Sequence, residues 1–330
     1  MRGLAGYIVR RLLLLPVILL AVSAITFTLG RLAPVDYVEV QAGTRATPET
    51  IERVREARGL NDPVYEQYIR YMGNVLQGDL GDSVRYRGSK VQDVIFPRLW
   101  VTVQYNAIVL VLTFAIAIPA GTWAALKRGT WLDPFSIGIF VLLAAVPVLV
   151  WIPTLQWLLS VKLGVLPCCG WSVNQRIDDA SGVELGVLSK NIILPVLILT
   201  LPSVAGVARY MRAQVLEVLD QDYVRTARAK GLEEFAIVFR HIIRNALLPI
   251  VTILSFDLAA LISGSIFVET LIGIPGIGAY TFESIGSRDY DSIMAIVLLG
   301  SAAFMLANLL ADIAYGFVDP RIRVGGEVGA

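Results

Sequence analysis

The residues of this chain with the clearest chemical character lie in one basic segment, residues 222–245, between two strongly apolar stretches. Its cations are Arg225, Arg228, Lys230, Arg240 and Arg244. Ala227 and Ala229 lie among them, and such small side chains leave low relief, so that the surface of another protein can approach closely. The pattern predicts a docking surface for a soluble partner. The simpler alternative, a solvated loop, explains the arginines but not the alanines or the length.

A short helix is expected to carry this surface. Good helix formers predominate from residue 220 to residue 230. The exceptions are Tyr223, Val224 and Thr226. Gly231 follows and provides the left-handed conformation that favours the end of a helix. A second helix is expected over residues 233–244, where apolar side chains lead back to the membrane. A helix that lies across a membrane face suits a groove on a soluble partner.

The composition places the chain among membrane proteins. Of its 330 residues, 56% are hydrophobic and 17% are charged, and the mean hydropathy is +0.67, far more apolar than a soluble domain of this length needs. The formal net charge of +1 provides no bulk field for nucleic acid. Cys168 and Cys169 are too few for a disulfide framework or a four-cysteine metal site. Because adjacent cysteines bridge only with strain, we expect two unbridged loop residues.

The expected fold is all-α and polytopic. A helix of about 20 apolar residues crosses the hydrocarbon core, and six segments meet this length: residues 8–32, 100–126, 134–163, 192–210, 247–268 and 293–317. Helices are favoured because lipid offers no partner for unpaired backbone groups, and the alternation of barrel strands is absent. The first segment has no small-residue cleavage site, so we expect a retained helix rather than a signal peptide.

The distribution of lysine and arginine predicts the orientation in the cell membrane. These residues gather in the amino-terminal tail, in the loop after the second span, in the basic segment and in the carboxyl tail. Because short cytoplasmic loops carry the excess of positive charge, both termini are expected in the cytoplasm. The basic segment then lies on the cytoplasmic side as well.

Three regions are expected along the chain. Residues 1–33 form the tail and the first span, residues 34–98 an extracytoplasmic helical insertion, and residues 99–330 the core, which contains the cytoplasmic loop 213–246. Within the insertion, Thr47 and Pro48 are typical of a helix start, and a second helix is expected from Pro63. Gly59 and Gly78 are expected to end these helices. The insertion either caps an external pore mouth or only stabilises the fold.

The basic segment resembles a known motif, the coupling loop of ABC-importer permeases. That motif has Glu-Ala-Ala, three residues, Gly, and nine residues before Ile-x-Leu-Pro. This chain has Arg225-Thr226-Ala227 for the triplet, Gly231 at the matching spacing, and His241-Ile242-Ile243-Arg244 at the end. The missing Glu and Pro are usual in the B-type subunit of dipeptide and oligopeptide importers. Other patches resemble that subunit in the same order: residues 59–63 with Tyr68, 78–83, 163–167 with 170–171, 268–270 with 275–278, 288–290 and 319–323.

The resemblance implies a type I ABC importer permease fold and a set of partners. The partners are a second homologous permease, two nucleotide-binding ATPase subunits or domains, an extracytoplasmic substrate-binding protein and membrane lipid. This chain has no Gly-x-x-x-x-Gly-Lys-Ser/Thr loop, so it is expected to be non-catalytic and to hold no cofactor or metal, with ATP and Mg on the partner subunits. The implied coupling residues are Tyr223, Arg225, Thr226, Ala227, Lys230, Gly231 and His241.

The same resemblance implies the transported solute and the conformational change. Dipeptides and oligopeptides are the expected substrates, with oligosaccharides, nickel complexes or glutathione as alternatives. Closure of the ATPase pair is expected to move the coupling helices together and to rock the bundle from inward-open to outward-open.

Ionisable residues inside the spans are candidates for the transport path, since each costs about 2.5–3.5 kcal/mol at mid-membrane. Asp257 lies well inside the fifth expected span and either contacts a peptide ammonium or, as we slightly prefer, is a polar partner of the second permease. Glu269 and Asp312 lie near span ends, where an ordinary helix-end position is favoured over a pathway role. Pro275 and Gly276 belong to a segment that forms an external gate or an ordinary turn.

Two other classes of protein fit the sequence less well. A secondary transporter should bury a charge relay or show inverted repeats, yet only Asp257 lies deep in a span. A membrane enzyme would need converging His, Cys or carboxylate groups, and the single His241 lies in the basic segment.

Overall fold

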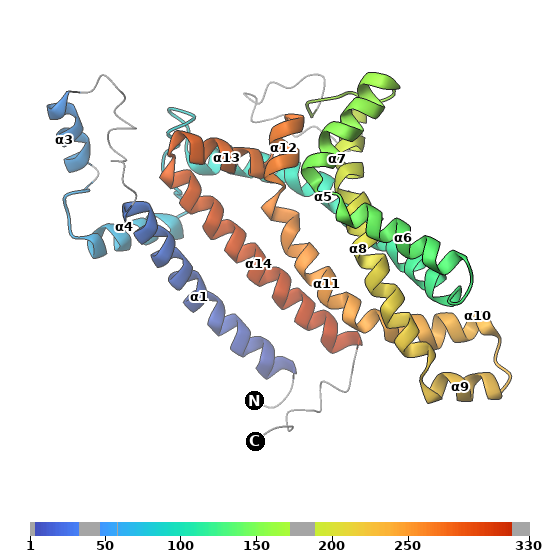
Figure 1. Cartoon of the computed structure of the whole chain (residues 1–330). Coiled ribbons are helices and arrows are strands. Elements are labelled where there is room, and N and C mark those ends of the chain that lie inside the picture. The colour runs from blue at the N-terminus through green and yellow to red at the C-terminus, as the bar shows by residue number, and fades with distance from the viewer. Residues whose placement is uncertain (1–3, 33–46, 58, 172–188, 319–330) are drawn as a thin grey trace.

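The computed structural model describes residues 4–32, 47–57, 59–171 and 189–318 (Figure 1). Within these ranges the regular structure is helical, apart from one isolated bridge between Asp82 and Lys90. The long helices run side by side, and α9 lies crosswise at one end of the molecule (Figure 1). The beginning of α1 and the end of α14 lie at that same end, whereas α12 and α13 lie at the other.

The long helices confirm an all-α fold built from apolar spans. They are α1 (Leu4–Leu32), α5 (Val91–Leu126), α8 (Ile193–Leu219), α11 (Arg244–Ser263) and α14 (Tyr290–Val318). Five helices of the described residues are long and apolar enough to cross a membrane, and a bent pair makes up to six. The expected six spans are therefore reached only if that pair counts as one.

A bent pair of helices forms the span expected over residues 134–163. It consists of α6 (Leu132–Ala145) and α7 (Val148–Leu155), which continues as the π-helical turn η1 (Gln156–Lys162). The two halves are bent by 93°. Val146 is extended and Pro147 follows it, as expected because proline disfavours the helical conformation of the residue before it.

The prediction of the fifth span as residues 247–268 is also wrong, because the helix begins and ends at other residues. A short helix α10 (Glu234–Ile237), the π-helical turn η4 (Val238–Ile243) and α11 form one continuous helical run, Glu234–Ser263. The run ends at Gly264, whose φ of 67° is left-handed. After this break come α12 (Ile266–Ile272) and α13 (Ile277–Ser287). The basic segment is therefore joined by continuous helix to the break at the other end of the molecule.

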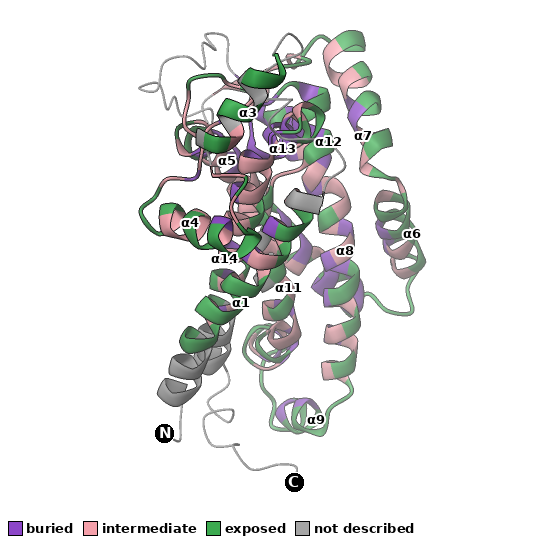
Figure 2. Ribbon diagram, turned by 90° about the vertical axis from the view of Figure 1, so that its left-hand side faces the viewer, coloured by how far each residue is buried: buried purple, intermediate pink, exposed green. Residues whose placement is uncertain are grey.

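The centre of the bundle is the pair α5 and α8. A β-carbon on Gly121 of α5 would lie 2.4 Å from the carbonyl oxygen of Ala208 in α8, so glycine is what permits this close approach. Such small-residue contacts are typical of membrane helix pairs. Buried residues gather in the interior around α8 and α13 (Figure 2). In the most apolar stretch of α8, half of the residues are buried, whereas in that of α1 only 11% are.

The insertion contains the two expected helices. They are α3 (Pro48–Ala57) and α4 (Val64–Leu76), and the glycines expected to end them, Gly59 and Gly78, have φ angles of 60° and 84°. Tyr68 of α4 packs on α1, where its hydroxyl lies 2.7 Å from the hydroxyl of Ser23. Because α5 already begins at Val91, its helix includes residues expected to belong to the insertion.

The two adjacent cysteines differ from the expectation. The structure pairs Cys168 and Cys169 in a disulfide. Hydrogen bonds fix the loop around them: Gln156 Nε2 donates to the carbonyl of Cys168 over 3.1 Å and Asn191 Nδ2 to that of Cys169 over 3.0 Å. These two bonds hold the backbone of both cysteines between η1 and the start of the η3–α8 helix (η3, Lys190–Ile192).

Candidate functional site: a basic loop and a buried carboxylate cluster

The basic loop is built around α9 (Asp222–Ala229). The helix ends at Lys230, and Gly231 has a φ of 75°, which confirms the expected left-handed stop. Tyr223, Arg225 and Lys230 are exposed on it. The side chain of Thr226 is exposed too and donates to the carbonyl of Asp222 over 2.9 Å.

One face of α9 packs inwards. Val224 and Ala227, three residues apart and therefore on one helix face, are 0% and 5% exposed. They join a core cluster with Met211 of α8 and Ile242 of η4. The expectation that Ala227 offers low relief to another protein is therefore wrong for its side chain. Ala229 is the exposed alanine, while Ala227 lets α9 pack closely on its own chain.

A two-bond ion pair braces the loop. Arg228 Nη2 donates to Glu234 Oε1 over 2.6 Å and Arg228 Nε to Oε2 over 3.2 Å, and the hydrogen bond to Glu234 raises the pKa of Arg228. This pair ties α9 to the start of the helical run that ends at Ser263. His241 is half-buried in that run, and its carbonyl accepts from Asn245 Nδ2 over 2.6 Å.

Aromatic side chains complete the surface of the loop. Phe235 and Phe239 are 72% and 57% exposed, and their ring centroids lie 4.5 Å apart. Leu232 and Tyr223 of the same loop are exposed as well. Sequence reasoning assigned the two phenylalanines to the apolar path back to the membrane. Their spacing of four residues, which places them on one helix face, was the available signal for a separate aromatic patch.

At the opposite end of the molecule, Glu269 of α12 is fully buried. Its Oε1 accepts from the hydroxyls of Thr102 and Tyr105 in α5, over 2.9 and 2.5 Å. Its Oε2 accepts from the backbone N–H of Ala279 in α13, over 2.9 Å. We call Glu269 with these three donors the Glu269 cluster. The expectation of an ordinary helix-end position is replaced by a carboxylate that joins three helices.

The backbone around Glu269 is shaped to hold the carboxylate. A β-carbon on Gly276 would lie 2.4 Å from the carboxyl carbon, and one on Gly264 2.6 Å from Oε1. The first turn of α13 points its N–H groups at the carboxylate, a position that favours negative charge. Burial raises the pKa of Glu269, and the hydrogen bonds from Tyr105 and Ala279 act in the opposite direction.

The two hydroxyls that donate to Glu269 also accept hydrogen bonds from backbone N–H groups. The Tyr105 hydroxyl oxygen accepts a hydrogen bond from the N–H of Ser265 over 3.3 Å, and the Thr102 hydroxyl oxygen accepts one from the N–H of Ile277 over 2.9 Å. Gly276 is buried as the cap of α13, directly after Pro275. The structure thus brings Glu269 and Gly276 together.

Asp257 lies half-buried in α11, outside this cluster, and the side chain of Asp312 lies outside the described residues.

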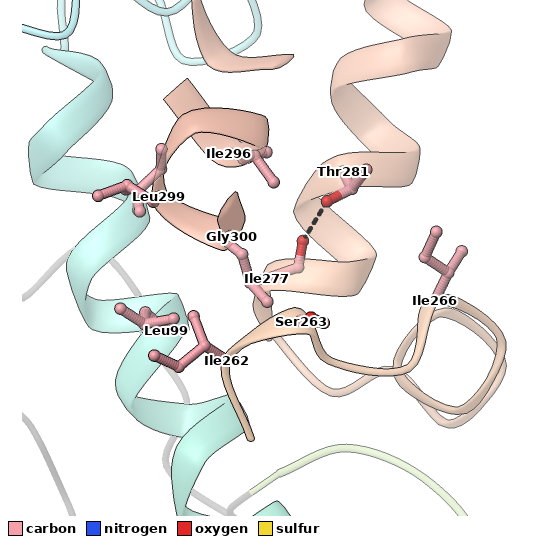
Figure 3. Close-up of a pocket in the computed structure, with 10 residues that line it drawn as sticks. Leu99, Ile262, Ser263, Ile266, Ile277, Thr281, Ile296, Leu299 and Gly300 are labelled. Atoms are coloured by element: carbon pink, nitrogen blue, oxygen red, sulfur yellow. Dashed lines mark hydrogen bonds between the residues drawn. The ribbon is translucent and has the colours of Figure 1, made fainter. Parts of the chain in front are cut away.

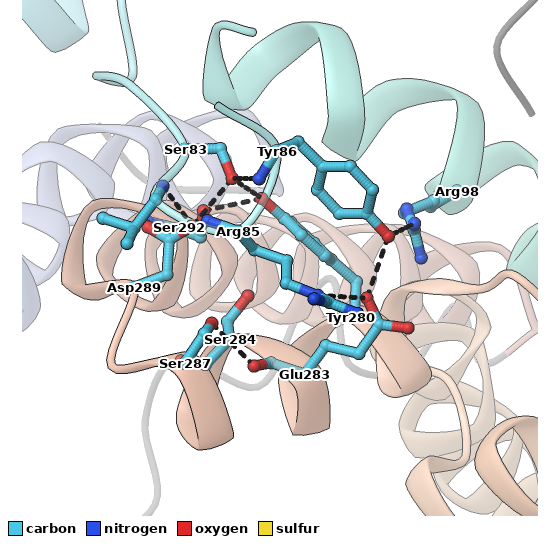
Figure 4. Close-up of polar contacts among 11 residues, drawn as sticks. Ser83, Arg85, Tyr86, Arg98, Tyr280, Glu283, Ser284, Ser287, Asp289 and Ser292 are labelled. Atoms are coloured by element: carbon cyan, nitrogen blue, oxygen red, sulfur yellow. Dashed lines mark hydrogen bonds and ion pairs between the residues drawn. The ribbon is translucent and has the colours of Figure 1, made fainter. Parts of the chain in front are cut away.

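A second buried carboxylate lies next to this region (Figure 4). Asp289 Oδ2 accepts from the Ser83 hydroxyl over 2.7 Å and from the N–H groups of Val84 and Arg85 over 2.8 and 3.2 Å. Oδ1 accepts from the N–H of Ser292 over 3.2 Å. Asp289 therefore fastens the last part of the insertion to the start of α14.

Arg98 of α5 completes that polar group (Figure 4). It is 4% exposed, and its guanidinium carbon lies 5.0 Å from the ring centroid of Tyr86 and 4.9 Å from that of Tyr280. It donates to the Tyr86 hydroxyl, which donates in turn to Glu283 over 2.9 Å. Sequence reasoning missed Arg98 and Asp289 as buried charges, because their partners lie far away in the chain.

An apolar cavity of about 180 Å³ opens at the α11–α12 break (Figure 3). It is lined mainly by Ile95, Leu99, Ile262, Ile266, Ile277 and Leu299. These residues come from α5, α11, α12, α13 and α14. The cavity and the Glu269 cluster thus share α5, α12 and α13.

Comparisons with known proteins agree over nearly the whole chain. Residues 117–324 match the family model described as binding-protein-dependent transport system inner membrane component, and residues 4–104 match the N-terminal model of such membrane components. The chain is 35% identical to the oligopeptide transport system permease protein AppB of Bacillus subtilis, over 97% of this chain and 100% of that protein. It is 33% identical to the dipeptide transport system permease protein DppB of Escherichia coli K12, over 96% and 98%.

The fold has a counterpart among solved structures. An inward-facing conformation of the MetNI methionine ABC transporter matches with a TM-score of 0.54 and 17% sequence identity, over 68% of this chain and 96% of that chain. At this identity the likeness concerns the fold alone.

Proposed function

Since this chain belongs to the family of binding-protein-dependent transport system inner membrane components, we propose that it forms half of the pore of an ATP-driven importer for dipeptides and oligopeptides. A second homologous permease supplies the other half, and an extracytoplasmic binding protein delivers the substrate. Relatives named as oligopeptide and dipeptide permeases, each covered almost completely, support the substrate class. Nickel complexes, glutathione or oligosaccharides are the alternative solutes.

The basic loop is the proposed docking site for the ATPase subunits, which bind ATP and Mg. Cations and aromatic rings are exposed on it, while Val224 and Ala227 fix α9 to its own chain. Because α9 packs on its own chain, a displacement of α9 by a bound partner is transmitted to the rest of the bundle. A flexible loop would not transmit that displacement. Both termini lie on the same, cytoplasmic side in this proposal, since the beginning of α1 and the end of α14 lie at the α9 end (Figure 1).

One observation carries the coupling proposal. The helical run Glu234–Ser263 begins at the Arg228–Glu234 pair and ends at Gly264, against the Glu269 carboxylate. A displacement of α9 is therefore transmitted through a continuous helix to the α11–α12 break at Gly264. Glu269, Pro275 and Gly276 are proposed to position the α12–α13 turn as the gate at the far side, and Asp257 of α11 moves with the same run. The change is a population shift between two packings of the bundle.

Gly231 provides the test of docking. Its φ of 75° is a conformation that residues with a side chain rarely adopt. A β-carbon added there would nevertheless meet nothing within 4 Å. A substitution therefore strains only the backbone of the loop and clashes with no neighbour. Gly231→Val should distort the loop, because a β-branched residue is strained at positive φ. Gly231→Asn is the matched control, because asparagine tolerates this conformation.

The assembled transporter with its ATPase subunits and binding protein is reconstituted in vesicles, and uptake of a labelled dipeptide is measured beside ATP hydrolysis. We expect Gly231→Val to keep membrane insertion and ATP hydrolysis but to lose most uptake, and Gly231→Asn to keep both. Undiminished uptake by Gly231→Val would contradict the docking role. Uptake by this permease and its homologue without any ATPase subunit would contradict the whole proposal.

A further inference from the structure

Cys168 and Cys169 form an exposed disulfide in the segment between η1 and η3. They are the only cysteines of the chain. The stabilisation that a disulfide provides through chain entropy grows with the length of the loop that it closes. A bridge between neighbouring residues closes the shortest loop there is, so it contributes little to the stability of the fold in this way. Its effect is on the local backbone, because two joined side chains restrict the peptide unit between them.

Side chains from both neighbouring elements hold the backbone of this pair. Gln156 of η1 donates to the carbonyl of Cys168, and Asn191 of η3 donates to the carbonyl of Cys169. Both hydrogen bonds require the two carbonyls to point in the directions that the bridged pair gives them. Opening the bridge frees the peptide unit between the two residues to rotate, which weakens these bonds.

The residue after the pair connects the segment to α12. The N–H of Gly170 donates to the carbonyl of Ile272 over 2.7 Å, and Ile272 is the last residue of α12. The last carbonyls of a helix have no partner within the helix, so Gly170 provides a donor from outside. The helices α7 and α12 lie side by side at this end of the molecule (Figure 1).

Trp171 extends the connection to the Glu269 cluster. Its side chain is 4% exposed, and its ring centroid lies 6.2 Å from that of Tyr105 in an edge-to-face arrangement. Tyr105 is one of the donors to Glu269, and both rings belong to one core cluster with Ile272. Contacts between neighbours therefore connect the disulfide to the end of α12 and to the carboxylate that α12 carries.

We propose that the Cys168–Cys169 disulfide is a site of reversible thiol–disulfide exchange with an external dithiol, and that its bridged form holds the end of α12 in place. Exposed disulfides are the labile ones, and both cysteines are exposed. A thiolate of the dithiol attacks one sulfur and forms a mixed disulfide, which the second thiol of the dithiol then breaks. The two cysteines gain two electrons and two protons, and the dithiol is oxidised to a disulfide.

The proposed function assigns this site to the extracytoplasmic side, since α12 lies at the end of the molecule opposite α9 (Figure 1). Disulfides form and persist on that side of a bacterial cell membrane. The exchange at Cys168 and Cys169 is independent of the proposed function, whereas its effect on uptake rests on it. The experiment therefore measures the two separately.

The first measurement follows the thiols and the backbone of the assembled transporter. One sample is treated with dithiothreitol, a small dithiol, and then with a thiol-alkylating reagent before mass spectrometry. We expect no alkylation of Cys168 and Cys169 without dithiothreitol and alkylation of both after it. In a second sample, reduced but not alkylated, hydrogen exchange is measured in peptides that cover Gly170 and the end of α12. Exchange should rise several-fold on reduction, because the bond to Ile272 is weakened.

Cys168→Ser combined with Cys169→Ser is the matched control, since serine is close to cysteine in size and cannot form the bridge. This double variant should exchange hydrogen like the reduced wild type and should not respond to dithiothreitol, which excludes an effect through thiols of a partner subunit. Asn191→Ala removes one of the bonds to the pair. It should raise hydrogen exchange at Gly170 while the disulfide stays closed.

The second measurement is dipeptide uptake by the transporter in reconstituted vesicles. Uptake should fall several-fold with dithiothreitol, recover after reoxidation with diamide, and respond to neither reagent in the double variant. Free thiols in the untreated transporter, unchanged hydrogen exchange after reduction, or unchanged uptake after reduction would each overturn the proposal. If the untreated wild type took up no dipeptide while its hydrogen exchange changed as expected, the proposed transport function would be wrong and the exchange site would stand.

Discussion

The two ends of the molecule use charged residues in opposite ways. At the α9 end, Arg225, Arg228 and Lys230 are exposed, and the ion pair between Arg228 and Glu234 leaves 42% and 57% of the two side chains exposed. At the α12 end, Glu269 and Asp289 are completely buried, and side-chain hydroxyls and backbone N–H groups of other segments donate hydrogen bonds to their carboxylates. A charge that is satisfied internally holds a fold together, whereas a charge left at the surface remains available to a partner.

The comparison predicts different costs for losing a charge at each end. Removing one partner from a buried charged network leaves donors without an acceptor and costs about 3–5 kcal/mol. Breaking an exposed pair costs about 0–1 kcal/mol. Stability should therefore be most sensitive at the α12 end, and coupling to ATPase subunits most sensitive at the α9 end.

The largest effect is expected for Glu269→Ala. The hydroxyls of Thr102 and Tyr105 and the N–H of Ala279 would lose their acceptor, which should destabilise the fold by about 3–5 kcal/mol. The measurement is the thermal unfolding midpoint of the assembled transporter in detergent. Glu66→Ala, which removes an exposed carboxylate from α4, is the control. Equal midpoints for the two variants would show that the Glu269 cluster does not hold α12 and α13 in place.

Asp289→Ala should have the next largest effect. It removes the acceptor of the Ser83 hydroxyl and of the N–H groups of Val84 and Arg85, at about 1.5–3 kcal/mol for hydrogen bonds to a charged group. Because these bonds hold the segment 79–90, the variant should be cut there faster in limited proteolysis. Asp289→Asn keeps one carbonyl acceptor and should be cut at an intermediate rate. Cleavage of both variants at the wild-type rate would contradict the anchoring role.

Gly276→Ala tests the space around the same carboxylate without removing any charge. The new β-carbon would lie 2.4 Å from the Glu269 carboxyl carbon, and overpacking of this kind costs about 1–3 kcal/mol. Gly206→Ala in α8 is the control, since nothing lies within 4 Å of the added atom and alanine favours helix. We expect a lower unfolding midpoint for the first variant and an unchanged or higher one for the second. The opposite order would mean that the turn after α12 can move away from Glu269 freely.

Features that depend on residues close together in the chain could be predicted from the sequence. Apolar length and helix-stop glycines predicted most spans, both insertion helices and the left-handed Gly231, because those features depend on residues close together in the chain. The break at Gly264 was missed, since the apolar run continues through it and no proline marks it. The start of α5 was missed because the span was predicted from apolar length, and Asp93, Pro97 and Arg98 interrupt the apolar run before residue 100.

The Glu269 cluster could not be predicted from the sequence for a different reason. Its donors Thr102 and Tyr105 lie 167 and 164 residues away from Glu269, and neither periodicity nor spacing relates residues that far apart. The inward face of α9 is an intermediate case. The spacing of Val224 and Ala227 was visible, but which side met the core depended on Met211 and Ile242.

The smallest effect on stability, and the sharpest test of the comparison, is expected for Arg228→Ala. The exposed pair with Glu234 contributes only about 0–1 kcal/mol, so the unfolding midpoint should stay close to that of the wild type. Uptake in reconstituted vesicles should nevertheless fall by several-fold at unchanged ATP hydrolysis, because α9 loses its link to the helical run that reaches Gly264. The exchanged pair, Arg228→Glu with Glu234→Arg, should restore part of the uptake, since it remakes the link with the charges reversed. If Arg228→Ala instead lowered the midpoint as far as Glu269→Ala does, the loop would be a structural brace like the buried cluster, and the division of roles between the two ends would be wrong.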